Sequence, residues 1–231
     1  MSAGRVGIIL QARFGSQRLP GKALALLGGT SILERCLTRL LASGVGRVVL
    51  ATTEAAEDDA LSFVASRMGI DVYRSSTDDV LTRYVGAALA CQFDFVVRAT
   101  GDNPAVDIDA PGRLLEIMRR ENADYACEDG LPYGAGVEIL SISTLTRTAS
   151  VASDAADREH VTTFVKRHPG TFRVVREPAP AALRRPDVRL TVDTADDFAF
   201  MQRVFGRVCA TDATLTDIII AADACSRSHA A

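Results

Sequence analysis

The stretch that decides the fold is RVGIILQARFGSQRLPGK, residues 5–22. Its first part, RVGIIL, is a short apolar run of the kind that forms a buried β-strand. The remainder is rich in turn-forming residues and carries Arg13, Arg18 and Lys22 with no acidic residue among them. Ligands of open α/β sheets bind beyond the carboxyl ends of strands. A buried strand that ends in a basic loop therefore predicts an anion site at its end.

Strand and helix patterns alternate through the first half of the chain. In residues 31–44 the apolar side chains recur at helical spacing, Ser31 and Glu34 form a capping-box pattern, and Gly44 is suited to end the helix. Such alternation predicts an α/β fold with crossover connections and a mostly parallel central sheet. The predicted strands span residues 5–10, 47–53, 70–74 and 93–100, and the predicted helices span 31–44, 57–69 and 78–90.

The second half is less regular, and we expect residues 1–231 to form a single domain. A strand is predicted to run into a helix over 136–149, and residues 177–187 hold three prolines and predict a loop or hinge. The other predicted elements are a helix over 157–170, strands over 171–175 and 188–194, and helices over 195–208 and 215–225.

Composition excludes several classes of function. A net charge of -3 and a pI of about 5.7 argue against a general nucleic-acid binder, so the basic loop suits a small anionic ligand. The five cysteines include no CxxC pair, which argues against a disulfide framework or a cysteine zinc site. We see no signal-peptide pattern and no apolar run long enough to cross a bilayer. The sequence predicts a reduced, cytoplasmic protein without a membrane partner.

The basic loop has two interpretations. Gly15 and Gly21 permit close backbone approach, Arg13 and Arg18 are suited to bidentate phosphate contacts, and Lys22 supplies a point charge. A solvated basic surface loop is the alternative, since runs of charge are often only solvated. The position of the loop after a buried strand favours the anion site.

Two aspartates each follow a predicted strand. Asp102 lies in TGDNP after the strand over 93–100, and Asp193 ends the strand over 188–194. Magnesium takes one or two carboxylates together with phosphate oxygens, so this pair suits a metal beside a phosphate loop. The alternatives are a turn aspartate bonded to its own backbone at 102 and a helix N-cap at 193. We also single out His160, for substrate contact or proton transfer, with a structural histidine as the alternative. Glu138 is an acid inside an apolar strand pattern, so it either faces solvent or has a buried polar role.

Three motifs in this order resemble those of the sugar cytidylyltransferases: LQARFGSQRLPGK at 10–22, RATGDNPAVD at 98–107 and RLTVDTADDF at 189–198. That family includes CMP-KDO synthetases, acylneuraminate cytidylyltransferases and spore-coat-polysaccharide cytidylyltransferase homologues. The last group also shows segments similar to DVLTRY at 79–84 and REHVT at 158–162. The resemblance spans nearly the whole chain.

The resemblance implies a Rossmann-like nucleotidyltransferase domain, CTP as a substrate, Mg²⁺ as the cofactor, and a homodimer formed partly by a sugar-side segment within residues 128–188. It implies that Asp102 and Asp193 bind the metal and that Lys22, Arg13 and Asp102 are catalytic. It assigns the nucleotide to Gln11, Ala12, Arg13, Gly15, Ser16, Arg18, Lys22, Asp79 and Arg83, and the sugar side to Glu138, Arg158 and His160. Thr100-Gly101-Asp102 stands where CMP-KDO synthetases carry a Gln-Gly-Asp-type turn, so the resemblance does not extend to sugar recognition at this turn.

In the expected reaction, a hydroxyl of an acidic or amino sugar attacks the α-phosphate of CTP, pyrophosphate leaves and a CMP-sugar forms for surface-polysaccharide biosynthesis. Negative charge develops on anionic oxygens, so catalysis needs cations and positioning. Two other functions stay open. A glycosyltransferase would need a DxD metal motif after a strand, which Asp107–Asp109 approximates. A non-catalytic nucleotide-binding protein would bind CTP without turnover.

Overall fold

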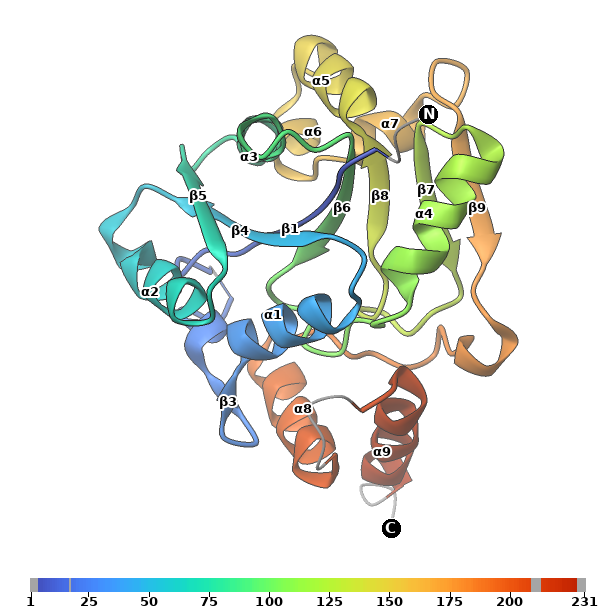
Figure 1. Ribbon diagram of the computed structural model, residues 1–231. Coiled ribbons are helices and arrows are strands. Elements are labelled where there is room, and N and C mark those ends of the chain that lie inside the picture. Colours follow the sequence, from blue (N-terminus) through green and yellow to red (C-terminus); the bar gives the residue numbers. More distant parts are fainter. Residues whose placement is uncertain (1–3, 17, 209–212, 228–231) are drawn as a thin grey trace.

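The computed structural model describes residues 4–16, 18–208 and 213–227. At its centre is a seven-stranded sheet in the order β5-β4-β1-β6-β8-β7-β9 (Figure 1). The strand predicted from the opening stretch is β1, which lies between β4 and β6. The strands are β1 (Val6–Gln11), β4 (Arg47–Thr53), β5 (Asp71–Ser75), β6 (Phe95–Thr100), β7 (Tyr125–Asp129), β8 (Glu138–Ser141) and β9 (Val174–Pro178).

The strands of the first half pair in parallel, as the alternating pattern predicts. β1 pairs with β4 and β6, and β4 pairs with β5, all in parallel. β8 is inserted antiparallel to both of its neighbours, β6 and β7, while β9 pairs in parallel with β7. Four of these six pairings are parallel, so the predicted α/β fold with a mostly parallel sheet is confirmed.

Helices cover both faces of the sheet because successive residues of a strand point to opposite faces. On β1, Ile8 and Leu10 pack into the core beneath α1, α2 and α4, whereas Ile9 packs with α3 and α5 (Figure 1). The helices are α1 (Ile32–Ala42), α2 (Asp59–Arg67), α3 (Val80–Ala90), α4 (Ala110–Glu121), α5 (Ile142–Val151), α6 (Ala155–Glu159), α7 (Thr163–Arg167), α8 (Ala195–Arg207) and α9 (Leu215–Arg227), with short 3-10 turns at Lys22–Leu24, Ala56–Asp58 and Ala181–Leu183.

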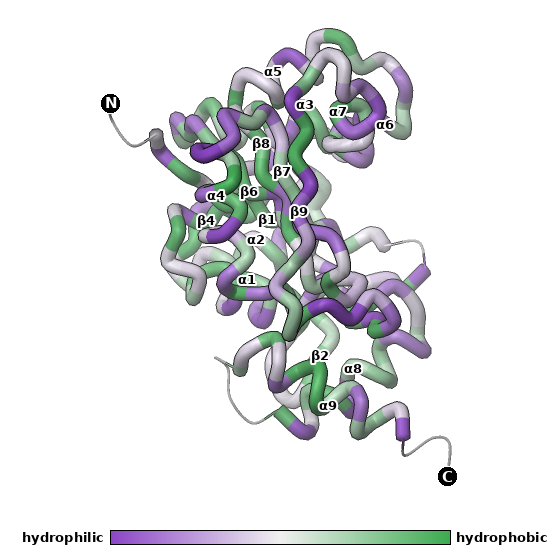
Figure 2. The backbone as a smooth tube through the Cα atoms, turned by 90° about the vertical axis from the view of Figure 1, so that its right-hand side faces the viewer, coloured by the Kyte–Doolittle hydropathy of each residue, from purple (hydrophilic) through white to green (hydrophobic). Residues whose placement is uncertain are grey.

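Helices α8 and α9 lie at the end of the molecule opposite to α5, α6 and α7 (Figure 2). They pack on each other, and α8 packs on β2 of a small hairpin formed by β2 (Leu26–Leu27) and β3 (Thr30–Ser31). Leu27 is fully buried there, and the guanidinium of Arg35 lies 4.3 Å from the centre of the Phe205 ring. This end of the chain thus belongs to the same hydrophobic core as one face of the sheet.

Two predicted elements of the second half are wrong. The helix predicted over 157–170 is two short helices, α6 and α7, because Val161 adopts a positive φ of 48° that interrupts the helical backbone. The strand predicted over 188–194 is an extended segment with a single bridge between Arg189 and Tyr133. The main-chain hydrogen bonds of this segment join it to the loops that carry Asp102 and Tyr133. Strand β7 and most of α4 were not predicted.

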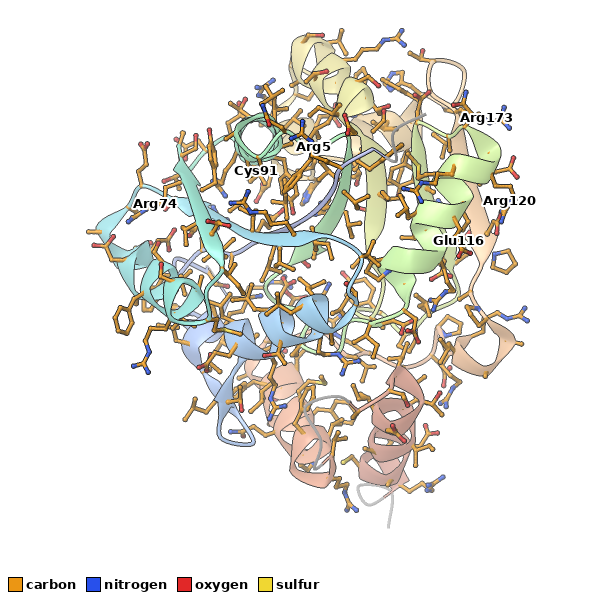
Figure 3. The ribbon with its side chains drawn as sticks, in the orientation of Figure 1. Arg5, Arg74, Cys91, Glu116, Arg120 and Arg173 are labelled. Carbon is orange, nitrogen blue, oxygen red and sulfur yellow. The ribbon has the colours of Figure 1, made fainter. Side chains whose placement is uncertain are left out.

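Charged side chains line both outer edges of the sheet (Figure 3). At the β5 edge, Arg74 donates to Asp59 at 2.6 Å. At the β9 edge, Arg176 makes two hydrogen bonds to Asp129, and Arg120 lies nearby on α4. Charges on edge strands oppose pairing with another chain, so both edges are protected against sheet extension.

Within residues 4–16, 18–208 and 213–227, the structure contains no helix with the length and hydrophobicity required to span a membrane.

Candidate functional site

The carboxyl ends of β1 and β6 lie side by side, because Gln11 pairs with Thr100 in their register. The basic loop leaves from Gln11 and the turn that carries Asp102 leaves from Thr100, so both open onto the same edge of the sheet. A cleft of about 630 Å³ lies at this edge. Of the residues expected to bind nucleotide, those that line the cleft are Gln11, Ala12, Arg13, Ser16, Arg18, Lys22 and Arg83.

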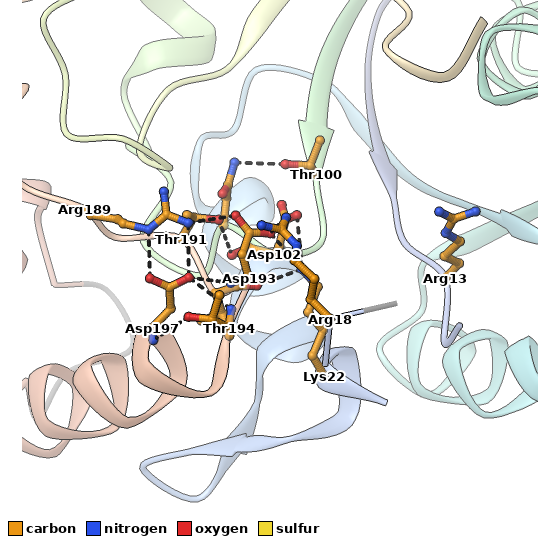
Figure 4. A network of polar contacts seen from close by, with 12 residues as sticks. Arg13, Arg18, Lys22, Thr100, Asp102, Arg189, Thr191, Asp193, Thr194 and Asp197 are labelled. Carbon is orange, nitrogen blue, oxygen red and sulfur yellow. Dashed lines mark hydrogen bonds and ion pairs between the residues drawn. The ribbon is translucent and has the colours of Figure 1, made fainter. Parts of the chain in front are cut away.

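Lys22 connects the basic loop to both strand-end carboxylates (Figure 4). Its Nζ donates to Asp102 Oδ2 at 3.3 Å and to Asp193 Oδ1 at 3.2 Å, and also to the main-chain oxygen of Val192 at 2.7 Å. The Lys22 side chain is only 12% exposed. Asp102 and Asp193 lie 80 and 171 positions from Lys22 in the sequence, and both contact its ammonium group at the wall of the cleft.

Asp193 is also held by two arginines. Arg18 Nη2 lies 3.0 Å from Asp193 Oδ1, and Arg189 Nη2 donates to Oδ2 at 2.9 Å. Arg189 pairs at the same time with Asp197, at 2.7 and 3.1 Å. The hydrogen bonds from Arg189, followed by those from the main-chain N–H groups of Asp193 and Thr194, outweigh burial and lower the pKa of Asp197 to about 2. Asp197 is thus a fixed negative charge behind Asp193.

The alternative in which Asp193 is only a helix N-cap is wrong. Thr194 is the N-cap of α8, and it forms a complete capping box with Asp197. This leaves the carboxylate of Asp193 free to face the cleft. Asp102 does lie in a turn, but its carboxylate accepts from Lys22 Nζ. Its main-chain oxygen accepts from Val192 N at 2.8 Å and from Thr191 Oγ1 at 3.2 Å, which ties the turn to the segment that carries Asp193.

Asp58, which was not among the predicted site residues, anchors the basic loop. Asp58 is fully buried, and its Oδ1 accepts from Phe14 N at 2.6 Å. Its Oδ2 accepts from Thr52 Oγ1 and from both the N–H and the hydroxyl of Thr53, at the end of β4. In sequence, Asp58 looks like an ordinary acid at the start of a helix, so only its burial identifies this role.

Four of the expected site residues lie outside the set that lines the cleft: Gly15, Asp79, Arg158 and Glu138. Gly15 lies against Glu57, whose Oε1 is 2.7 Å from the position of an added Cβ. Asp79 is the N-cap of α3, where it accepts from Thr82 N, and it pairs with Arg158 at 2.5 Å. Asp79 and Arg158 therefore join α3 to α6. Of the other candidates, Arg13 and His160 both line the cleft, and Arg13 lies 3.6 Å from Glu159.

Glu138 lies beside a second cavity, of about 310 Å³, that shares Arg98 and Tyr133 with the cleft. Its two oxygens accept from Arg98 (2.9 Å), Thr162 (3.0 Å), Lys166 (2.6 Å) and Tyr125 (2.6 Å). Burial alone would raise the pKa of Glu138, but the charges of Arg98 and Lys166 and these hydrogen bonds lower it to about 2. Of the two roles considered for this acid, the structure shows the buried polar one.

The donor set limits what metal the site could hold. Among the described residues there is no cluster of three or more His, Cys, Asp or Glu side chains suited to a metal ion. Asp102 and Asp193 nevertheless face one shared cation, the Lys22 ammonium, which shows that a positive charge is accommodated between them. Two carboxylates fit an ion such as Mg²⁺ that obtains its other ligands from phosphate oxygens and water.

The Asp107–Asp109 segment does not form a DxD metal motif. Asp107 is buried and pairs with Arg113 at 2.6 Å, and Asp109 is the N-cap residue of α4. Neither carboxylate is among the groups that line the cleft. The main sequence feature in favour of a glycosyltransferase is thereby removed.

Comparison with known proteins gives consistent results. A family model described as cytidylyltransferase matches residues 7–221. The uncharacterized protein MJ1063 of Methanocaldococcus jannaschii is 36% identical over 191 residues, 82% of this chain and 79% of that protein. The spore coat polysaccharide biosynthesis protein SpsF of Bacillus subtilis is 32% identical, over 85% of both chains. The structure of a cytidylyltransferase from Leptospira borgpetersenii superposes with a TM-score of 0.90 at 28% identity, covering 98% of this chain and 96% of that one.

Proposed function

The chain belongs to the cytidylyltransferase family, and from this premise we propose that it transfers the cytidylyl group of CTP to a hydroxyl of an acidic or amino sugar. The products are a CMP-sugar and pyrophosphate. The Bacillus relative is named as a spore coat polysaccharide biosynthesis protein, which supports a role in making a surface polysaccharide. We propose a cytoplasmic location for this reaction.

One observation carries the proposal: Lys22 joins Asp102 and Asp193 at the wall of a cleft that basic side chains also line. The cationic side chains of the cleft suit a triphosphate, and its carboxylates suit a metal. Lys22 contacts both of these carboxylates. A purely structural ion-pair network has no need of a 630 Å³ cleft beside it. An anionic ligand with a bound divalent metal uses both sets of charges.

The cationic and the acidic residues of the site have different roles. Arg13, Arg18 and Lys22 bind the triphosphate and stabilise the negative charge that develops on the departing pyrophosphate. Asp102 and Asp193 hold Mg²⁺, which neutralises phosphate charge when it is bound. Arg189 keeps Asp193 in place through its 2.9 Å contact. The main chain beside Gln11 and Ala12 is suited to hold the base and ribose at the end of β1.

We place the sugar in the 310 Å³ cavity, next to the cleft. Arg98 and Tyr133 line both spaces, so a sugar in one lies beside a nucleotide in the other. Tyr133 is 61% exposed and its ring lies 4.8 Å from the guanidinium of Arg189, which gives the boundary an apolar face suited to a sugar ring. Glu138 lines this cavity, and His160 lines the cleft.

We also propose that two chains form a homodimer through residues 128–188, within one domain that spans 1–231. The exposed apolar side chains Tyr133 and Val151 lie in this segment and support that choice. Light scattering coupled to size exclusion tests the dimer. A monomer at micromolar concentration would contradict it.

The reaction is tested by pyrophosphate release from CTP, UTP, ATP and GTP, each with Mg²⁺ and a panel of acidic and amino sugars. We expect release with CTP and one class of sugar. Asp102→Asn should abolish it while the far-UV circular dichroism spectrum stays unchanged. The matched control is Asp109→Asn, an aspartate at the start of α4 that is not among the residues lining the cleft. Release that persists in Asp102→Asn would remove Asp102 from the mechanism.

A further inference from the structure

The ion pairs that involve Asp102 and Asp193 form a network with equal numbers of cations and carboxylates. Three cations and three carboxylates form what we call the charge cluster: Arg18, Lys22, Arg189, Asp102, Asp193 and Asp197. Lys22 holds the central position in it, as the one member that contacts both Asp102 and Asp193 (Figure 4). Of the other two cations, Arg18 contacts the same Asp193 oxygen as Lys22, Oδ1, and Arg189 contacts Oδ2.

The Lys22 ammonium and a divalent ion would compete for the same oxygens. Oδ2 of Asp102 and Oδ1 of Asp193 are the atoms that face Nζ, at 3.3 and 3.2 Å. A metal needs these lone pairs at about 2.1 Å, and a doubly charged ion beside a little-exposed ammonium is strongly repelled. The two cations therefore exclude each other, so a metal binds both carboxylates only after Lys22 has moved.

The Lys22 ammonium can move away from the two carboxylates. Its side chain is a flexible four-carbon stem, and its remaining hydrogen bond goes to a neutral acceptor, the main-chain oxygen of Val192. It follows Gly21, whose φ of 70° places the start of the short 3-10 turn at the wall of the cleft. Phosphate oxygens in the cleft would offer the ammonium a charged acceptor in exchange.

We propose that Lys22 is an internal substitute for the divalent cation. It holds Asp102 and Asp193 at their positions until nucleotide phosphates draw its ammonium away, and the metal then takes its place. This inference rests on the proposed function, in that it assumes a metal bound by these two carboxylates. The consequence is that the metal and the nucleotide bind cooperatively, and that the metal alone binds weakly.

The test measures binding of Mn²⁺ alone, by electron paramagnetic resonance of the free ion, without nucleotide or sugar. Lys22→Met keeps the length of the side chain and removes its charge. We expect it to bind Mn²⁺ on the order of tenfold or more tightly than the wild-type protein, because one adjacent positive charge has gone. Equal affinities of the two proteins would overturn the proposal.

Two controls separate this idea from a general effect of charge. Arg189→Met also removes one cation from Asp193, but from Oδ2, the oxygen that Lys22 does not contact, so it should leave Mn²⁺ affinity near the wild-type value or weaken it. A gain equal to that of Lys22→Met would contradict the proposal. In the double variant Lys22→Met/Asp102→Asn the gain should disappear. Its persistence would place the metal elsewhere and refute the idea.

If Lys22→Met does not fold, Lys22→Gln provides the same test with a polar side chain. The assay contains neither CTP nor sugar, so its outcome is separate from that of the proposed reaction. A tenfold gain without any pyrophosphate release would support the role of Lys22 and reject only the cytidylyl transfer. Pyrophosphate release with equal Mn²⁺ affinities would do the reverse.

Discussion

Replacing Glu138 by glutamine should destabilise the protein strongly, although the two side chains have the same shape. Four donors converge on the carboxylate, and two of them, Arg98 and Lys166, are cations. An amide has one oxygen and one NH₂ group. Tyr125 and Thr162 can rotate their hydroxyls toward either, but a cation cannot accept a hydrogen bond. Whichever way the amide turns, one of the two cations loses its acceptor.

The magnitude follows from the pKa of Glu138. It falls from its ordinary value of 4.5 to about 2 in the folded protein. At about 1.4 kcal/mol per pKa unit, this corresponds to about 3 kcal/mol of folding free energy. Leaving one partner of a buried ion pair alone typically costs about 3 to 5 kcal/mol, which agrees. Because the folded pKa is lowered, this stabilisation is fully present above pH 4.5 and is lost as the pH falls toward 2.

The assay is urea unfolding followed by far-UV circular dichroism, since the chain contains no tryptophan. At pH 7 we expect Glu138→Gln to lower the free energy of unfolding by about 3 kcal/mol, and the deficit to shrink between pH 4.5 and pH 2. Asp71→Asn is the control, because Asp71 is 54% exposed and its pair with Arg47 should be worth less than about 1 kcal/mol. A deficit for Glu138→Gln no larger than the control, or one constant over that pH range, would refute the reasoning.

Three further predictions concern the charge cluster and its support. Lys22→Ala should cost about 2 to 4 kcal/mol of transition-state stabilisation, measured as kcat/KM for CTP; an unchanged value would exclude a contact with the leaving group. Arg189→Gln should weaken Mn²⁺ binding in the presence of nucleotide and lower kcat, because it frees Asp193 to rotate, and Arg189→Lys should restore part of both. Thr194→Ala should lower the free energy of unfolding by about 1 kcal/mol through loss of the α8 cap, seen in urea titrations.

Much of the fold is predictable from the sequence because local signals agree with the tertiary structure. The capping box of Ser31 and Glu34 starts α1 where predicted, and Gly44, with a φ of 63°, follows its end. One exception is the helix predicted over 157–170. Its apolar spacing is helical, but Val161 is fully buried in the core under α3 and α5, and this burial holds a backbone φ that valine seldom adopts. Tertiary packing overrides local periodicity there.

The position of the candidate site can be predicted from the sequence, but the ion pairs and hydrogen bonds between its side chains cannot. Strand ends in a parallel sheet meet at one edge, so the sequence places Lys22 and Asp102 near each other. It contains no signal that Asp79 and Arg158, expected on the ligand, are bonded to each other, or that Asp58 anchors the basic loop. Ion pairs between distant segments depend on side-chain geometry, which residue spacing does not encode.

The backbone hydrogen bonds that bring Asp193 to the site also explain why residues 188–194 do not form the predicted strand. Tyr133 N donates to Val188 O, Leu190 N donates to Tyr133 O, and Val192 N donates to Asp102 O. The apolar residues of the alternating pattern do point into the core, since Leu190 and Val192 are fully buried. However, its backbone partners are two loops, so no regular strand pairing forms. The same hydrogen bonds that prevent a strand place Asp193 beside Asp102, and therefore the position of the second carboxylate depends on the loop that carries the first.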